Sequence, residues 1–368
     1  MSQQGIYHEL KPVWWLAREG NLQLPAAPKQ VHWVLSDLCN QDCNFCSYRV
    51  SGNPSNELFT SGAKVSAYGH DNPVRWVDTE RALRLVAEMK DLGVLAVQAT
   101  GGGEPTAHPD HELIFETILD AGMQLSLVSN GYRWRERLFT SIPKMLWMRV
   151  SLDAGTALTY STIRRVPLTA MRKVLDNIER AAAAIREADS NTALGVGYTV
   201  TPDNWQEILY GCTAAKAAGA HNVRISAMFG PENEKPFLPI YDDIKQQIKE
   251  AKALEDGTFT IYDNFGERLS DLVQHSPDYT FCPYQYYTTY LGGNLKLFRC
   301  CVLSYSKRGM IASGDLTNQR FDDYWRSADR IRDFAAFDAR GCPRCMFNGK
   351  NRALNYVLDP KPAHVEFP

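Results

Sequence analysis

The sequence predicts an α/β fold, an open and partial (β/α)6 barrel followed by a small C-terminal module. Between residues 79 and 254, apolar strand-like runs alternate with amphipathic helix-like runs, a pattern typical of βα units around a parallel sheet. Past residue 280 this alternation stops and cysteines and aromatic residues become frequent. The expected divisions are an N-terminal extension, the barrel, a connecting helix and strand, and the module with its tail, at residues 1–30, 31–240, 241–281 and 282–368.

The elements of the barrel follow from the spacing of apolar residues. The first strand is expected at 31–35, and the Gly-, Ser-, Asn- and Pro-rich stretch 47–76 after it is expected to be a long loop or cap. Helical spacing predicts helices at 79–92, 111–121, 135–141, 171–188, 205–218 and 242–254. Buried-type strands are expected at 94–99, 123–128, 146–152, 193–200 and 222–228, which makes six with the first.

Composition limits the classes of function. The chain has 368 residues and a net charge of −2, with 40 Lys and Arg against 42 Asp and Glu, so it lacks the electrostatic footprint of a nucleic-acid-binding protein. No apolar run approaches the ~20 residues of a membrane span. The N-terminus has no signal-peptide pattern, so a cytoplasmic location is expected. Nine cysteines in such a chain favour metal or redox roles over disulfides.

Three cysteines stand in one short stretch after the first strand. Cys39, Cys43 and Cys46 have the spacing C-x3-C-x2-C, and polar residues lie between them. Three thiolates can bind one soft metal centre from a single loop but leave one coordination position open. The alternatives are three packed cysteines or a zinc knuckle, although zinc sites usually add a second pair of ligands nearby.

The motif C-x3-C-x-Phe45-C resembles the signature of the radical S-adenosylmethionine (radical SAM) enzymes. The resemblance implies a [4Fe-4S] cluster held by the three cysteines, with S-adenosylmethionine chelating the fourth iron. It also implies reductive cleavage to a 5'-deoxyadenosyl radical that abstracts hydrogen from an unactivated C–H bond. Phe45 would lie near the adenine, and the partial barrel is the core that the family implies.

A glycine run follows the second predicted strand, at Thr100-Gly-Gly-Gly-Glu-Pro105. Glycines let the backbone approach a ligand closely, but the run could also be an ordinary strand-to-helix turn. It resembles the family's G-G-E-P element, which contacts the amino group of S-adenosylmethionine. On that match, Gly102, Gly103 and Glu104 are candidate cofactor-binding residues, since an ammonium needs acceptors and a carboxylate supplies a charge-assisted one.

Further polar residues are expected at the ends of strands, where a barrel carries its chemistry. Ser151 and Asp153 end the fourth strand and are two residues apart, so they would share a face. The resemblance implies contacts to the ribose or carboxylate, and a helix cap is the alternative. Asn130, in the turn after the third strand, is a weaker candidate. Either Arg164 or Arg165 could pair with the methionine carboxylate, and we assign Arg165, although a surface charge is equally compatible with the sequence.

The C-terminal region carries a second cysteine set. Cys282, Cys300, Cys342 and Cys345 could converge into a closed site with four thiolate ligands, which suits either a second [4Fe-4S] cluster or structural zinc. The region resembles the auxiliary-cluster module called a twitch domain, a shortened SPASM domain, and the first motif favours a cluster. Cys301 has no assigned role and is an alternative ligand, a hydrogen-atom donor or a core residue.

A closed auxiliary cluster suits electron transfer, so we expect a radical SAM oxidoreductase with two [4Fe-4S] clusters and S-adenosylmethionine as cofactors. The substrate would be a small molecule or a peptide, and a donor such as flavodoxin or ferredoxin would supply electrons. About thirty residues precede the first strand, too few for the leader-binding domain of many peptide-modifying relatives. The alternatives are an epimerase or a peptide-crosslinking maturase of the same superfamily, and a non-enzymatic zinc or iron–sulfur protein.

Overall fold

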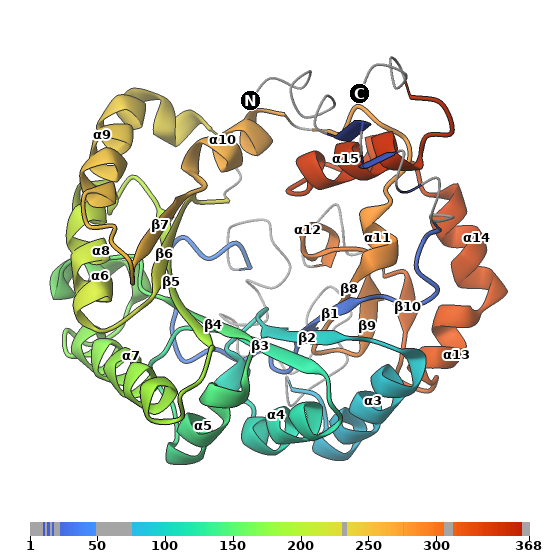
Figure 1. Cartoon of the computed structure of the whole chain (residues 1–368), viewed down its shortest axis with the longest axis horizontal. Coiled ribbons are helices and arrows are strands. Elements are labelled where there is room, and N and C mark those ends of the chain that lie inside the picture. Colours follow the sequence, from blue (N-terminus) through green and yellow to red (C-terminus); the bar gives the residue numbers. More distant parts are fainter. Residues whose placement is uncertain are drawn as a thin grey trace.

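One continuous sheet organises the molecule. The computed structural model describes residues 10–11, 13–14, 17, 23–48, 76–229, 234–274, 276–304 and 312–362, and the predicted cap at 47–76 lies almost entirely outside them. Ten strands follow the order β10-β9-β8-β1-β2-β3-β4-β5-β6-β7. The sheet curves into an open barrel, and helices line its outer side (Figure 1).

The barrel consists of parallel neighbours in chain order. Its strands are β1 (Gln30–Val34), β2 (Ala96–Thr100), β3 (Gln124–Ser129), β4 (Trp147–Ser151), β5 (Ala193–Val200), β6 (Asn222–Ala227) and β7 (Thr260–Asp263). The intervening helices are α3 (Thr79–Leu92), α4 (His111–Asp120), α5 (Glu136–Ser141), α6 (Ala157–Arg164), α7 (Ala170–Glu187), α8 (Ile208–Ala217), α9 (Tyr241–Lys252) and α10 (Phe265–Val273). The partial α/β barrel is therefore confirmed, with β7 extending the six predicted strands and α6 added before α7.

The amphipathic pattern explains why these segments fold as they do. Asp78 caps α3 by accepting from Arg81 N, and Gly93 ends the helix at φ 94°, a left-handed conformation that favours glycine. Along β4, the residues Met148 and Val150 are buried against the helices, while Trp147, Arg149 and Ser151 alternate with them on the other face. This alternation places polar side chains inside the barrel.

The C-terminal segment extends the sheet beside β1. Strand β8 (Thr288–Leu291) pairs in parallel with β1, and β9 (Lys296–Phe298) and β10 (Gly314–Asp315) follow as antiparallel neighbours. The remaining helices are α11 (Tyr284–Tyr287), α12 (Cys301–Ser304), α13 (Phe321–Arg326), α14 (Ala328–Ala336) and α15 (Asn348–Leu358). The predicted C-terminal module is thus hydrogen-bonded to the barrel through one shared sheet.

A buried carboxylate fastens α13 to α3. Glu88 lies in an ion pair with Arg81 at 2.7 Å and accepts from Phe321 N at 2.9 Å. Arg81 also donates to the carbonyl oxygen of Leu316. These contacts fix the C-terminal helices against the first helix of the barrel, so the C-terminal cysteines have a defined place relative to the barrel.

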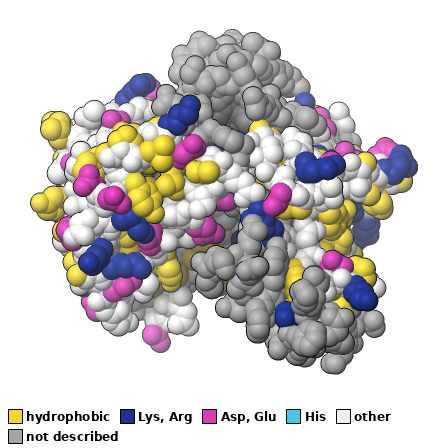
Figure 2. Space-filling model, turned by 90° about the horizontal axis from the view of Figure 1, so that it is seen from above, with side chains coloured by type: hydrophobic (Ala, Val, Ile, Leu, Met, Phe, Trp, Pro, Cys, Tyr) yellow, Lys and Arg dark blue, Asp and Glu magenta, His cyan; other side chains and the backbone are white. Residues whose placement is uncertain are grey.

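The exposed surface carries mixed charge on the face seen in Figure 2, where basic and acidic side chains are interspersed. No helix among the described residues has the length and apolar character needed to cross a membrane. The mixed charges agree with the balanced composition and show no single-sign patch on this face.

Candidate active site

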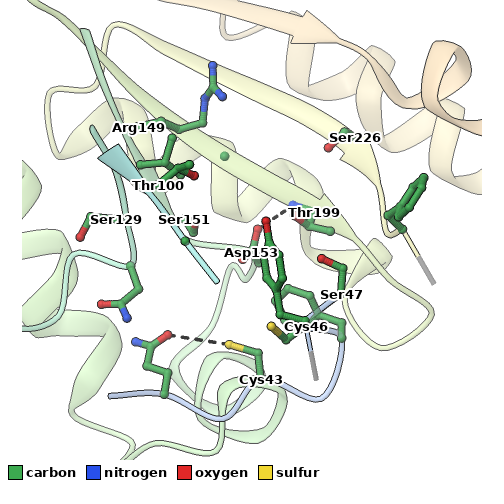
Figure 3. A pocket seen from close by; sticks show the side chains of 18 of the residues that line it. Cys43, Cys46, Ser47, Thr100, Ser129, Arg149, Ser151, Asp153, Thr199 and Ser226 are labelled. Carbon is green, nitrogen blue, oxygen red and sulfur yellow. Dashed lines mark hydrogen bonds between the residues drawn. The ribbon is translucent and has the colours of Figure 1, made fainter. Parts of the chain in front are cut away.

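A cavity of about 400 Å³ lies inside the barrel and extends to the loops at the carboxyl ends of the strands. This volume is within the range of small-molecule sites. Figure 3 shows Cys43 and Cys46 at one side of the cavity and Arg149 at the other. The predicted site residues that line it are Cys39, Cys43, Phe45, Cys46, Gly103, Glu104, Asn130, Ser151 and Asp153.

The cysteine loop is docked onto the end of α6. Asn44 N donates to Ile163 O at 2.8 Å, and Asp42 N donates to Arg164 O at 3.2 Å. Because helix-terminal carbonyls have no partner within their own helix, these bonds satisfy acceptors as well as holding the loop. The two bonds hold the middle of the cysteine loop, and Cys43 and Cys46 line the cavity from this fixed backbone.

Two amide side chains lie beside the sulfur atoms. Asn130 Nδ2 is 3.7 Å from Cys39 Sγ and donates to Asn40 Oδ1 at 2.6 Å. Gln41 Oε1 lies 3.9 Å from Cys43 Sγ. Asn130 therefore connects the turn after β3 to the cysteine loop.

The glycine loop after β2 lies directly against the segment that leads into Cys39. Gly103 N donates to Ser36 O at 3.0 Å, and Glu104 N donates to Leu38 O at 2.8 Å. A Cβ atom at Gly103 would lie 2.1 Å from Leu38 O, which is far inside van der Waals contact. The close approach of these two loops therefore requires glycine at this position.

Glu104 is buried, and its carboxylate is held by the backbone and hydroxyl groups around it. Its Oε1 accepts from Ser129 Oγ at 2.7 Å and from the hydroxyl and N–H of Thr106, while Oε2 accepts from Asn130 N at 2.8 Å. Burial raises the pKa of Glu104, and these hydrogen bonds act in the opposite direction. Oε2 accepts one of these bonds, so it keeps capacity for a cationic donor from the cavity.

Asp153 and Arg164 form a buried ion pair behind the cysteine loop. Thr199 N donates to Asp153 Oδ1 at 2.6 Å, and Arg164 donates to Ser151 O at 2.9 Å and to Gln41 Oε1. Burial alone would lower the pKa of Arg164, but the charges of its neighbours, Asp153 among them, outweigh it and raise that pKa, so the guanidinium stays charged. The pair joins the end of β4 to α6 and to the cysteine loop.

Replacing Arg164 by methionine should lower the free energy of unfolding by about 3–5 kcal/mol, because Asp153 would remain buried without a counter-charge. The adjacent Arg165→Met provides the matched control, since Arg165 pairs with Asp42 at an exposed position and should cost less than about 1 kcal/mol. Urea unfolding monitored by circular dichroism measures both. Equal losses for the two variants would contradict the assigned role of the buried pair.

The four C-terminal cysteines predicted to act together line one second cavity. Cys282, Cys300, Cys342 and Cys345 all contribute to a largely enclosed space of about 20 Å³, whereas Cys301 does not. This volume is roughly that of one ordered water, so a larger group would require the thiols to rotate outward. The structure thus brings together the predicted set and leaves Cys301 outside it.

Burial keeps these thiols in the neutral form. It raises the pKa of Cys282 to about 11 and that of Cys342 to about 12, and it also raises the pKa of Cys345. Phe347 N donates to Cys345 Sγ at 3.3 Å, and Tyr279 Oη lies 3.4 Å from the same sulfur. A thiophilic metal centre would displace the protons, since thiolates are the ligating form.

The arrangement of the cysteines indicates whether each set suits a single metal ion or a larger cluster. In the part of the chain that the structure describes, no three His, Cys, Asp or Glu side chains converge closely enough for a single metal ion. Both cysteine sets instead surround a space. At the first site, three thiols share a roomy cavity with the carboxylate of Glu104, and this donor set fits a cluster with an open position and an adjacent ammonium-bearing ligand.

Two predicted residues lie away from the first cavity. Arg165 ends α6 in a left-handed conformation with φ 51° and points to Asp42 in an exposed ion pair, so Arg164 and not Arg165 lines the cavity. Gly102 is likewise absent from the lining, although Gly101 and Gly103 on either side of it are present. A direct cofactor contact for Arg165 stays a prediction, and the helix end places its side chain outside the cavity lining.

Several lining residues were not predicted. They are the inward-facing residues of β4, β5 and β6 together with Arg268 of α10, namely Arg149, Gly197, Thr199, Arg224, Ser226 and Arg268. A signal existed in the sequence, because polar or small residues occupy every second position of β5 and β6, and Arg149 and Ser151 do so on β4.

Sequence comparison identifies the family. Residues 33–209 match the family model of the radical SAM superfamily, a range that contains all three cysteines and the glycine loop. The chain therefore contains a radical SAM domain in this range. The family implies a [4Fe-4S] cluster and S-adenosylmethionine, and the first cavity holds the residue types that both require.

Two curated relatives match part of the chain. A probable GTP 3',8-cyclase of Pyrobaculum aerophilum is 28% identical over 156 residues, which cover 42% of this chain and 44% of the relative. An AdoMet-dependent heme synthase of Methanosarcina barkeri is 27% identical over 196 residues, or 53% of this chain and 49% of the relative. The chain spans about half the length of these curated relatives.

Solved structures share the radical SAM fold more widely. Streptococcus suis SuiB bound to the precursor peptide SuiA matches with a TM-score of 0.58 at 12% identity, over 88% of this chain and 70% of that chain. The enzyme anSMEcpe with bound AdoMet matches with a TM-score of 0.55 at 14% identity, over 83% of each chain. At such identities the likeness establishes the fold alone.

Proposed function

We propose that this protein is a radical SAM oxidoreductase that modifies a small molecule or a peptide. The observation that carries the proposal is one cavity that combines three thiols from a single loop with the Glu104 carboxylate from the neighbouring loop. When bound, the cluster and S-adenosylmethionine supply a 5'-deoxyadenosyl radical through one-electron reductive cleavage. The protein's own residues bind and orient these groups within the barrel.

The loops divide this task between metal and cofactor. Cys39, Cys43 and Cys46 would hold the cluster and leave one position for S-adenosylmethionine. Glu104 Oε2 would accept from its ammonium group, and Asn130 fixes that carboxylate while it contacts the cysteine loop. Ser151 and Asp153, at the end of β4, lie on the side where the ribose would be bound, and Phe45 lies beside them on the cavity wall.

We assign the C-terminal cysteine set to a second [4Fe-4S] cluster that accepts an electron. Four thiols around one cavity leave no position for substrate, so transfer of electrons is the function that such a closed site suits. A cluster held by these thiols would supply an acceptor for one electron of a two-electron oxidation, in which the substrate gives up one hydrogen atom, one electron and one proton. A flavodoxin or ferredoxin supplies the electron that starts each turnover.

Product analysis tests the radical assignment. Protein loaded with iron and sulfide under anaerobic conditions should release 5'-deoxyadenosine and methionine on addition of dithionite and S-adenosylmethionine, and should release neither without dithionite. Absence of release from protein that contains its clusters would contradict the assignment and favour a non-enzymatic metal-binding protein. Metal analysis separates the two options for the second site, because a zinc site would leave about four irons and one zinc in place of about eight irons.

A second candidate is modification of a peptide by epimerisation or crosslinking. It is favoured by the fold shared with SuiB, whose structure contains the precursor peptide SuiA. Net oxidation leaves reduced clusters after one turnover without added oxidant, whereas epimerisation returns a hydrogen atom to the substrate. Counting electrons delivered per 5'-deoxyadenosine, once a substrate is in hand, distinguishes the two outcomes.

A further inference from the structure

Three arginine side chains gather in the cavity away from the cysteine loop. Arg149 comes from β4, Arg224 from β6 and Arg268 from α10, and all three line the same space as the thiols. Arg268 is paired with Asp271 at 3.2 Å. Within the described part of the chain, no ion pair involves Arg149 or Arg224, and Arg149 Nε is buried without a hydrogen-bond partner. Glu267 is close enough to Arg224 to act on its pKa, so three arginines face two carboxylates and this part of the cavity carries an excess of positive charge.

Strand β5 lies between the two arginines and carries glycine at the positions paired with them. Arg149 is paired in register with Gly195, and Arg224 is paired with Gly197 on the same strand β5. A Cβ atom at Gly197 would lie 3.2 Å from Arg149 Cδ, so glycine leaves room for the arginine to cross β5. The guanidinium carbon of Arg149 lies 5.1 Å from the centroid of the Trp147 ring, in a cation–π contact.

The buried cations repel each other. Burial and the charge of Arg224 lower the pKa of Arg149 to about 10. Burial and the charge of Arg268 also lower the pKa of Arg224, against the opposing charge of Glu267. The cavity's carboxylates do not relieve this repulsion, because Asp153 is paired with Arg164 and Glu104 is held by its own hydrogen bonds. A bound anion would relieve it and would fill the fork geometry that guanidinium groups offer to oxyanions.

Hydroxyl groups separate this charge from the cysteines. Ser151 follows Arg149 by two residues on β4, and Ser226 follows Arg224 by two on β6. Thr199 likewise follows Gly197, so each hydroxyl residue lines the cavity roughly 7 Å further along its own strand. Figure 3 shows Ser151 and Thr199 between Arg149 and the cysteine loop. A molecule held by its anionic group at the arginines would direct its next carbons past the hydroxyls toward the site of radical formation.

We propose that the substrate is an organic oxyanion, a carboxylate or a phosphate monoester, anchored by Arg149 and Arg224 at the inner end of the cavity. The role as substrate site rests on the proposed radical SAM function, whereas anion binding itself does not. Carboxylate and phosphate share this chemistry, and separate probes distinguish them. Arg268 contributes further positive charge while remaining paired with Asp271.

The test measures binding of inorganic phosphate and of acetate to the cluster-loaded full chain, by the rise in melting temperature and by calorimetric titration. At least one anion should stabilise the protein. Arg149→Gln and Arg224→Gln should each weaken its binding by about tenfold or more, since hydrogen bonds to charged groups are lost. Arg149→Lys should retain part of the affinity. The exposed Arg84→Gln is the matched control and should bind as the wild type does.

The folding of the variants is monitored in the same experiment. Without anion, the glutamine variants should melt no lower than the wild type, because each removes one member of a repelling pair. Failure of both anions to bind the wild type, or equal binding by Arg149→Gln, would overturn the proposal. Release of 5'-deoxyadenosine by the wild type, recorded separately, shows whether the radical SAM function itself stands in either case.

Discussion

Replacing Cys39, Cys43 and Cys46 together by alanine is expected to abolish 5'-deoxyadenosine release and to leave about four of about eight irons per chain. The physical reason is that all three thiols line the barrel cavity, while the other four line a separate cavity in the C-terminal segment. Loss of one set therefore leaves the donors of the other intact. Iron analysis together with chromatography of the reaction products measures both effects.

Cys212→Ala is the control for this experiment. Cys212 is fully buried in α8 and belongs to the hydrophobic core, so its replacement should change stability without changing iron content. A triple variant that retained no iron would contradict the independence of the two sites. A triple variant that still released 5'-deoxyadenosine would contradict the assignment of the three cysteines.

Gly103→Ala is expected to remove binding of S-adenosylmethionine and to destabilise the protein by about 3 kcal/mol or more. The new Cβ would lie 2.1 Å from Leu38 O and 2.6 Å from the backbone carbon of Asp37, so both loops would have to move apart. Their separation would displace Glu104 from the thiols, because Gly103 N and Glu104 N bond directly to the segment before Cys39. Calorimetric titration with S-adenosylmethionine and thermal melting are the measurements.

Gly257→Ala is the matched control for that substitution. No atom lies within 4 Å of a Cβ built at Gly257, and its φ is outside the left-handed region, so alanine should be tolerated. It should change the free energy of unfolding by less than about 1 kcal/mol, since it reduces only the freedom of the unfolded chain. Equal behaviour of the two glycine variants would show that the loop contact at Gly103 is not required.

Local periodicity was sufficient to predict most of the barrel. The predicted helix 79–92 has the same bounds as α3, and the predicted strand 193–200 has the same bounds as β5, because both combine a clear period with end signals. The sequence did not indicate α6, which has eight residues and begins shortly after the end of β4. Parallel pairing of β8 with β1 joins residues far apart in the chain, and local patterns carry no information on such contacts.

The first site was predictable where its residues belong to one short motif on a single loop. Spacing alone grouped Cys39, Cys43 and Cys46, and the structure brings them to one cavity with Glu104. The choice between Arg164 and Arg165 depended on where α6 ends, and a shift of one residue there exchanges a buried side chain for an exposed one. The arginines within β4 and β6 became significant only when the sheet register placed them across β5.

The central claim is that the cysteine-loop site is open to S-adenosylmethionine and that the C-terminal site is closed. Electron paramagnetic resonance of the dithionite-reduced protein, recorded before and after addition of S-adenosylmethionine, tests this claim most directly. The wild-type spectrum should change, and the signal that remains in the triple-alanine variant should not. An unchanged wild-type spectrum, or a changed spectrum in the variant, would contradict the account.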